Sequence, residues 1–227
     1  TIGNENGLSL EELDEIFSDK KSETAEHWTM LRPLPLTQPL KDRASTLIRQ
    51  MVTARLKGSN GIFISGVLDG DRGLLNDDGG PTPLFLPFRT TAMSLRGAKH
   101  LGSFQLPDSP TNYVFERDKS MIFVFPGDKS FSTKLNLGDA VEHVDMWGRR
   151  SPLTRETEKH HVKSDGQPIF CIGGSEAMAR WRLETGFAKG MIPAEYGGHP
   201  DTIVGRNTWS QGVKGTVSLK IPRDWEA

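Results

Sequence analysis

The most constraining feature of the sequence is a change of periodicity near residue 98. Over residues 42–57, apolar side chains recur at the three- and four-residue spacing of an amphipathic helix, and Gly58 is a typical helix stop. Residues 61–65 are apolar without alternation, the pattern of a parallel strand covered on both faces. A helix followed by such a strand indicates an α/β layer. Residues 84–97 predict a second helix, with an apolar face formed by Leu84, Phe85, Phe88, Ala92 and Leu95.

After residue 98 the sequence has the texture of β-structure. Residues 113–117 and 121–125 flank a short turn, as in a β-hairpin, and further short strands are expected over residues 131–137, 141–147, 161–163 and 168–172. Six short strands broken by Gly, Pro and Asp predict an antiparallel β-sandwich with residues 121–125 at its centre. The sequence therefore predicts an α+β chain in three parts: an α/β segment over 1–98, a β-sandwich domain over 99–174, and a further β element over 175–227.

Composition excludes several classes of function. The chain has 28 Lys+Arg against 29 Asp+Glu, a net charge of −1, so it lacks the positive charge that nucleic-acid binding requires. Its mean hydropathy is −0.46, and no apolar run approaches the roughly 20 residues of a membrane span. The single cysteine, Cys171, excludes an internal disulfide and a thiolate metal site, and its place between two apolar residues predicts a buried, inert thiol. The chain starts at Thr1 without Met or a signal segment, which indicates a processed product or an excised fragment.

The polar loop over residues 66–80 is the best candidate site, because loops that leave the carboxyl ends of parallel strands carry the chemistry of α/β folds. Asp69, Asp71 and Arg72 are its charged residues nearest to the strand. The alternative is an ordinary surface loop, since Gly and Asp are common turn formers.

Metal binding is not expected. Asp69 and Asp71 match the first two ligand positions of a calcium-binding EF-hand loop, but Gly73 stands where the next ligand belongs. His160 and His161 are adjacent on a predicted strand, so their side chains point to opposite faces and cannot readily share one ion. No cofactor is expected either.

Several motifs together resemble the carboxyl end of large bacterial glycoside-hydrolase-like proteins. These are the strand over residues 61–65, PFRTTA at the start of 87–98, the stretch 101–107, NYVFER over 112–117, DMWGR over 145–149 and the strand over 168–173. In that family a (β/α)8 barrel ends in a helix and is followed by a β-sandwich. The resemblance implies terminal βα units of a (β/α)8-type barrel followed by an antiparallel β-sandwich. Residues 207–225 resemble the opening strands of an Ig-like accessory domain.

This resemblance implies a secreted or periplasmic protein that acts on or binds a polysaccharide. Residues 28–32 would form barrel strand seven, 42–57 its helix, 62–65 strand eight and 84–97 the last helix. Most of the barrel would then lie upstream, so the chain alone is expected to be inactive. The implied substrate contacts are Asp69, Asp71, Arg72, Trp28 and Arg32, and Asp69 and Asp71 are the catalytic candidates. Retaining enzymes of this type carry a nucleophilic carboxylate after strand seven, where this sequence has Arg32 followed by proline.

Other interpretations stay open at this point. The chain could be a non-catalytic β-sandwich module that binds carbohydrate or another protein, and the single thiol also permits an intracellular structural protein. Trp181, Trp209 and Trp225 could form a sugar-stacking platform, although core and strand-edge packing is the simpler role for them. Nothing in the sequence defines an oligomeric state.

Overall fold

The computed structural model describes residues 28–106, 110–157, 159–177 and 179, and four short strands further along the chain. These four strands form two antiparallel pairs: β12 (Gly186–Phe187) with β15 (Val217–Ser218), and β13 (Ala194–Tyr196) with β14 (Gly205–Asn207). Trp181, Trp209 and Trp225 lie outside the described residues, as does most of the predicted third part of the chain. The described part is α+β, with two α-helices and mostly antiparallel sheets.

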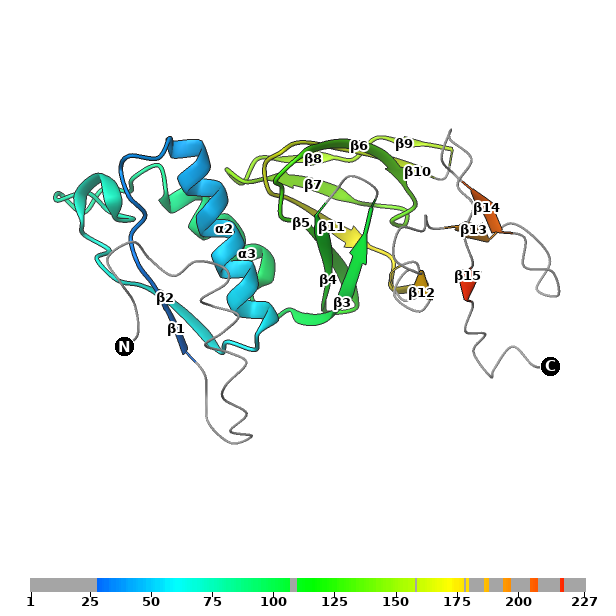
Figure 1. Cartoon of the computed structure of the whole chain (residues 1–227), viewed down its shortest axis with the longest axis horizontal. Coiled ribbons are helices and arrows are strands. Elements are labelled where there is room, and N and C mark those ends of the chain that lie inside the picture. Colours follow the sequence, from blue (N-terminus) through cyan, green and yellow to red (C-terminus); the bar gives the residue numbers. More distant parts are fainter. Residues whose placement is uncertain are drawn as a thin grey trace.

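The first layer is a two-stranded parallel sheet of β1 (Trp28–Leu31) and β2 (Gly61–Ile64). The helices α2 (Leu40–Leu56) and α3 (Phe85–Leu95) form the next layer, between this pair and the antiparallel sheets (Figure 1). The structure confirms the helix predicted over residues 42–57. The helix ends at Leu56, and two residues later Gly58 takes a φ of 84° and lets the amide of Ser59 bond back to the carbonyl of Ala54.

A six-stranded antiparallel sheet packs on the other side of the helices, in the spatial order β3-β4-β5-β11-β7-β8. Phe123 at its centre is fully buried, which confirms the prediction of a central strand over residues 121–125. Asp118 and Lys119 both have positive φ and form the tight turn between β4 and β5, as the hairpin pattern predicted. The strands are β3 (Lys99–Gln105), β4 (Thr111–Arg117), β5 (Ser120–Phe125), β7 (Glu142–Asp145), β8 (Arg150–Pro152) and β11 (Ile169–Gly174).

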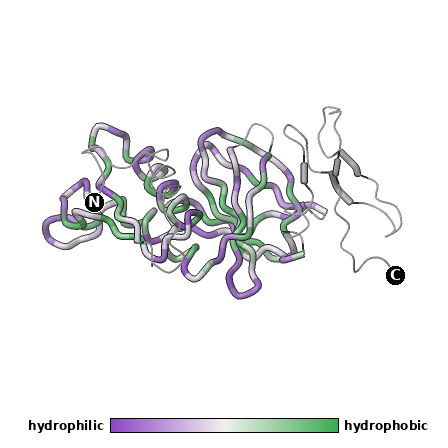
Figure 2. The backbone as a smooth tube through the Cα atoms, turned by 60° about the horizontal axis from the view of Figure 1, so that its bottom comes forward, coloured by the Kyte–Doolittle hydropathy of each residue, from purple (hydrophilic) through white to green (hydrophobic). Residues whose placement is uncertain are grey.

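The last layer is a three-stranded antiparallel sheet in the order β6-β10-β9, formed by β6 (Ser130–Leu135), β10 (Lys159–Asp165) and β9 (Arg155–Glu156). Its inner face packs on the six-stranded sheet through an apolar cluster that includes Phe123, Leu135 and Val162. Figure 2 shows hydrophobic stretches of the chain, in green, where strands converge near the middle of the molecule.

A second apolar cluster joins the helices to the six-stranded sheet. It runs from Leu31 on β1 through Ile48 on α2 to Phe115 and Phe170 on the sheet. The helices therefore share a core with the strands that follow residue 98, even though the sequence texture changes there.

The structure corrects three details of the predictions. Phe63 of β2 is half exposed, so the expectation of a strand covered on both faces is wrong for the described residues. The buried face of α3 is wider than predicted: Leu84 and Leu95 of the predicted face are buried and Phe85, Phe88 and Ala92 pack against the same cluster, but Thr90, Thr91 and Ser94 are buried as well. Finally, β3, β8 and β9 are strands that the hydrophobic pattern did not predict, because all three carry mostly exposed polar side chains.

Candidate functional site

The candidate site lies at the carboxyl-terminal end of the two parallel strands. Because β1 and β2 run in the same direction, the chain leaves both strands at this end. The amide of Ser65, just after β2, donates to the carbonyl of Leu31 at 2.9 Å, and its hydroxyl donates to the same oxygen at 3.2 Å. A Cβ on Gly66 would lie 3.1 Å from the ring of Pro33, so the two outgoing segments touch.

The loop after β2 has a defined shape. It contains a single 3-10 turn, η1 (Gly70–Arg72), and then folds back so that the amides of Leu74 and Leu75 both donate to the carbonyl of Val67. Gly73 lies against the carbonyls of Gly66 and Val67, where the backbone leaves no room for a side chain. Leu74 is buried and anchors the end of the turn in the core. The site candidates thus sit on an ordered loop, as a binding site requires.

Arg43 of α2 is hydrogen-bonded to the backbone of this loop. Its Nη2 donates to the backbone carbonyl of Asp71 at 2.7 Å, and its side chain is nearly buried. Burial lowers the pKa of Arg43 and Arg72 lowers it further, while Asp71 raises it. Arginine nevertheless stays charged in proteins, so a permanent positive charge lies beneath Asp71.

The charged side chains of the loop are available to a ligand. Asp69 and Arg72 are each nearly half exposed, and the Asp69 carboxylate lies 3.6 Å from Nε of Arg72. An exposed pair of this kind contributes little to stability, because water screens it. Both side chains can therefore give up this ion pair and hydrogen-bond the hydroxyl groups of a bound molecule instead. The stability of the fold would change little.

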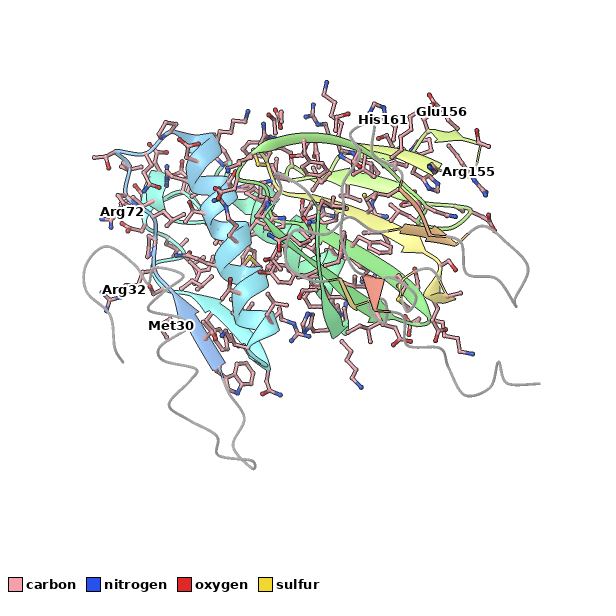
Figure 3. All side chains as sticks on the ribbon, turned by 45° about the vertical axis from the view of Figure 1, so that its right-hand side comes forward. Met30, Arg32, Arg72, Arg155, Glu156 and His161 are labelled. Atoms are coloured by element: carbon pink, nitrogen blue, oxygen red, sulfur yellow. The ribbon has the colours of Figure 1, made fainter. Side chains whose placement is uncertain are left out.

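The five predicted contact residues do not all lie together. Asp69, Asp71 and Arg72 occupy one loop, and Arg32 follows β1 at the same end of the pair. Figure 3 shows Arg32 and Arg72 in the same end region of the molecule. Trp28 begins β1 and so lies at the opposite end of that strand, about 10 Å of strand away from the carboxyl-terminal end.

The outer face of the parallel pair is a feature that the sequence analysis missed. Trp28, Met30 and Phe63 lie on this face and are 56%, 55% and 50% exposed. The rings of Trp28 and Phe63 stack with centroids 5.0 Å apart, and the indole lies over Gly61, where a Cβ would collide with it. The alternation of Trp28 and Met30 along β1 was the available signal, since residues two apart share one face of a strand.

The described residues offer no alternative centre of metal or thiol chemistry. Within them, no three His, Cys, Asp or Glu side chains gather as a possible metal group. Burial raises the pKa of the Cys171 thiol to about 12, so this cysteine is protonated and inert at neutral pH, as predicted. His160 is buried and His161 is exposed, which confirms that the two adjacent side chains point to opposite faces.

No family model matches the chain, and no curated protein matches it. Solved structures do share its fold. One is a family 39 glycoside hydrolase from the gut symbiont Bacteroides cellulosilyticus WH2, with a TM-score of 0.55 and 17% identity over 72% of this chain and 37% of that one. Another is a GH30 endoxylanase from Clostridium papyrosolvens C71, with a TM-score of 0.55 and 15% identity over 74% of this chain and 46% of that one.

At these identities the likeness is one of fold. The chain spans less than half the length of either glycoside hydrolase, and its fold corresponds to a part of theirs. Neither described helix combines the length and the apolar character that a membrane span needs.

Proposed function

We propose that this chain is the carboxyl-terminal portion of a carbohydrate-active, glycoside-hydrolase-like protein that acts on or binds a polysaccharide. In this proposal β1, α2, β2 and α3 are the last two βα units of a (β/α)8-type barrel, and the two antiparallel sheets are the β-sandwich that follows it. The division into parts at residues 98 and 174, the Ig-like character of residues 175–227 and a secreted or periplasmic location belong to the same proposal.

The observation that carries the proposal is the two-sided character of the parallel pair. One face packs on helices through Leu31, Ile62 and Ile64, while the other face presents exposed aromatic and methionine side chains. Soluble proteins rarely leave a contiguous apolar sheet face open to water, and a parallel sheet is normally covered on both faces. Further strands of a closed barrel would cover this face with the packed interior side chains that such barrels contain.

The exposed face of α3 supports the same arrangement. Leu86 and Met93 are seven residues apart, so they lie on one side of the helix, and both are largely exposed. A neighbouring helix in the outer ring of a barrel would cover them. The helix layer and the strand layer thus both present uncovered apolar groups.

In this proposal the loop after β2 supplies the polar groups that bind the sugar. Asp69, Asp71 and Arg72 leave the carboxyl end of β2, where the sites of such barrels lie, and their charged groups can hydrogen-bond sugar hydroxyls. Arg32 joins them from the end of β1. We assign Trp28 to the apolar face instead, because it lies at the other end of the strand.

A non-catalytic role is the second candidate, and one observation favours it. β1 ends in Leu31 and is followed by Arg32 and proline, so no carboxylate stands directly after this strand. Glycoside hydrolysis generally uses two carboxyl groups that flank the scissile bond. A binding module would need only the hydroxyl contacts of the loop.

Affinity electrophoresis of the chain in gels containing xylan, starch or other soluble polysaccharides tests the proposal. We expect at least one polysaccharide to retard the protein, and the double variant Asp69→Asn/Asp71→Asn to lose about 1–3 kcal/mol of binding, a roughly 5- to 150-fold weaker affinity. Asp77→Asn/Asp78→Asn is the matched control, because it removes the same charge from the next turn of the same loop and should leave binding unchanged.

No retardation by any polysaccharide in the panel would contradict the proposal, as would equal losses in both double variants. Reducing-end release by the full-length gene product on the polysaccharide that binds then separates the two candidates. Turnover identifies an enzyme, and binding without turnover identifies a binding module.

A further inference from the structure

His160 is a buried titratable group that the proposed site does not use. Its side chain is 1% exposed and lies on the same face of β10 as Val162, which belongs to the apolar cluster between the two sheets. Neither ring nitrogen has a hydrogen-bond partner of ordinary geometry. A neutral imidazole can occupy such a place at some cost, whereas a charged one would lose its hydration without compensation.

The charges around the ring do not favour its protonation. Arg155 of β9 is the cross-strand partner of His160 and opposes a second positive charge, while Asp139 and the carbonyl of Leu135 favour one. Asp139 already accepts from Nη1 of Arg155 at 2.6 Å. Burial is the largest effect and lowers the pKa of His160.

The remaining titratable groups near the ring lie either on the outer face of the three-stranded sheet or on the six-stranded sheet that faces it. By strand register, Lys134, Glu156, Lys159 and His161 lie on the outer face of the three-stranded sheet. On the facing sheet, the titratable residues on the face turned toward β10 are Lys99, Glu116, His143, Asp145 and Cys171. Asp139 is the acid that favours a positive charge on the His160 ring.

The strand that pairs with β10 beside His160 is the shortest in its sheet. β9 has only two residues, both exposed, and its register pairs are Glu156 with Lys159 and Arg155 with His160. Other ties of this segment are the bond from the His161 amide to the Thr154 carbonyl at 3.2 Å and the exposed ion pairs Lys134–Glu156 and Arg155–Asp139. Short edge segments with few buried contacts open at low free energy.

We propose that His160 is an acid-sensitive latch, whose protonation releases β9 from β10 while the two sheets stay folded. A protonated ring gains hydration by turning outward, and β9 with its Arg155 side chain must move away for this to happen. Release also separates two positive charges and uncovers the edge of β10. The inference is independent of the carbohydrate proposal, because it concerns the far end of the molecule, where Figure 3 shows Arg155, Glu156 and His161.

Hydrogen–deuterium exchange of the whole chain tests the latch. After correction for intrinsic exchange, the protection of amides over residues 153–161 should fall about tenfold between pH 7.5 and pH 5.5. Tenfold is the limit because opening takes up one proton, and pH 5.5 lies one unit below the pKa of about 6.5 expected for the histidine in the open state. Amides of β5 should keep their protection. His160→Gln should remove the pH effect, and His161→Gln, the adjacent exposed histidine, should retain it.

Protection over residues 153–161 that does not change with pH would overturn the proposal, as would a pH effect that survives in His160→Gln. If His160→Gln does not fold, NMR titration of the unmodified protein decides the question. The amide shifts of β9 should then follow the titration of the His160 ring, and shifts that follow another histidine, such as His143, would overturn the latch.

Discussion

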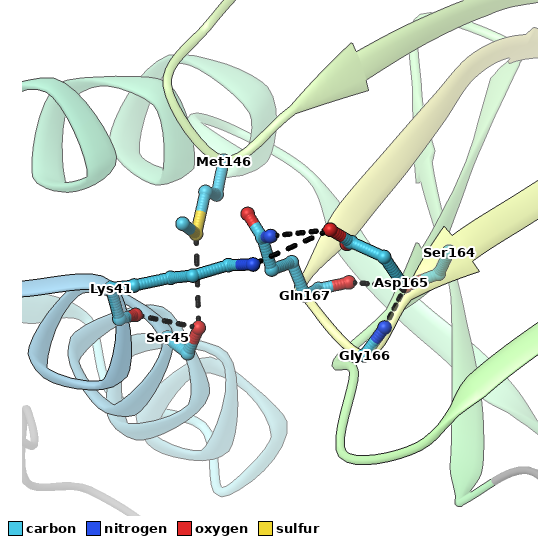
Figure 4. Close-up of polar contacts among 7 residues, drawn as sticks. All are labelled: Lys41, Ser45, Met146, Ser164, Asp165, Gly166 and Gln167. Carbon is cyan, nitrogen blue, oxygen red and sulfur yellow. Dashed lines mark hydrogen bonds and ion pairs between the residues drawn. The ribbon is translucent and has the colours of Figure 1, made fainter.

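The hydroxyl of Ser45 on α2 lies 3.7 Å from the sulfur of Met146, in the turn between β7 and β8 (Figure 4). Lys41 and Arg49 stand four residues to either side of Ser45 on the same face of α2. Lys41 pairs with Asp165, the last residue of β10, and Arg49 pairs with Asp128 in the turn after β5. One helix face therefore contacts two turns of the antiparallel sheets and the end of β10, which fixes the helices on that part of the fold.

Met146 should carry most of the energy of this contact. The Ser45 hydroxyl has one proton, and the carbonyl of Lys41, at 2.9 Å, is the stronger acceptor for it. We expect Met146→Ala to cost about 2–5 kcal/mol in urea unfolding, Met146→Leu less than about 1.5 kcal/mol, and Ser45→Ala less than about 1 kcal/mol. A larger loss for Ser45→Ala than for Met146→Ala would show that the polar contact dominates.

Phe123 tests the centre of the core. The side chain is fully buried and forms an edge contact with Phe104, so Phe123→Ala should cost about 3–5 kcal/mol of unfolding free energy. Phe63→Ala is the matched control, because the same residue type is half exposed there and should cost less than about 1 kcal/mol in this chain. Similar losses at the two positions would contradict the burial pattern.

Gly148 allows a backbone effect to be separated from a packing effect. It has a φ of 86°, and a Cβ there would lie 2.7 Å from the hydroxyl of Thr90 on α3. Gly58 has a φ of 84° with no atom within 4 Å of the same position. Gly58→Ala should therefore cost about 1–2 kcal/mol from strain alone, and Gly148→Ala about 1–3 kcal/mol more.

A double-mutant cycle then isolates the Thr90 contact. In a Thr90→Ala background, Gly148→Ala should cost no more than Gly58→Ala does. An unchanged cost would assign the whole effect to the backbone of the turn.

Stability should fall in mild acid. Burial lowers the pKa of both His143 and His160 in the folded protein, with Asp145 partly opposing the effect at His143. As the pH falls below about 6.5, the unfolded chain takes up protons that the folded chain does not, so the free energy of unfolding decreases. Above that pH these groups contribute no pH dependence. Urea titrations from pH 7.5 to 5.5 should show the decrease, and a flat profile would contradict it.

The sequence predicted local structure where one pattern dominated. The helix over residues 42–57 and the hairpin around Asp118 were both recognisable, because amphipathic spacing and turn residues act locally. β3 was missed because this strand carries His100, Gly102 and Ser103 and none of its side chains is fully buried, although its backbone pairs with β4 along its length. The apolar face of α3 was predicted, but the burial of Thr90 beside it was not, because Thr90 packs against Gly148, which lies far away in the sequence.

The candidate site was predictable to the same extent. The loop after β2 could be located from the strand before it, and the structure places Asp69, Asp71 and Arg72 there together. The hydrogen bond from Arg43 to the loop joins residues 28 positions apart and ends on a backbone carbonyl. No sequence motif therefore predicts it. Arg43→Met should therefore loosen the loop and weaken any polysaccharide binding, while Arg43→Lys should restore part of it, as affinity electrophoresis would show.

The most direct test of the account is hydrogen–deuterium exchange of β1 and β2 in this chain and in the full-length gene product. If the parallel pair belongs to a closed barrel, the amides over residues 28–31 and 61–64 should exchange at least about tenfold more slowly in the longer protein, because both strands gain neighbours and a covered outer face. Amides of β5 serve as the internal reference and should not change. Equal exchange of β1 and β2 in the two proteins would contradict the barrel, and with it the assignment of this chain to a glycoside-hydrolase-like protein.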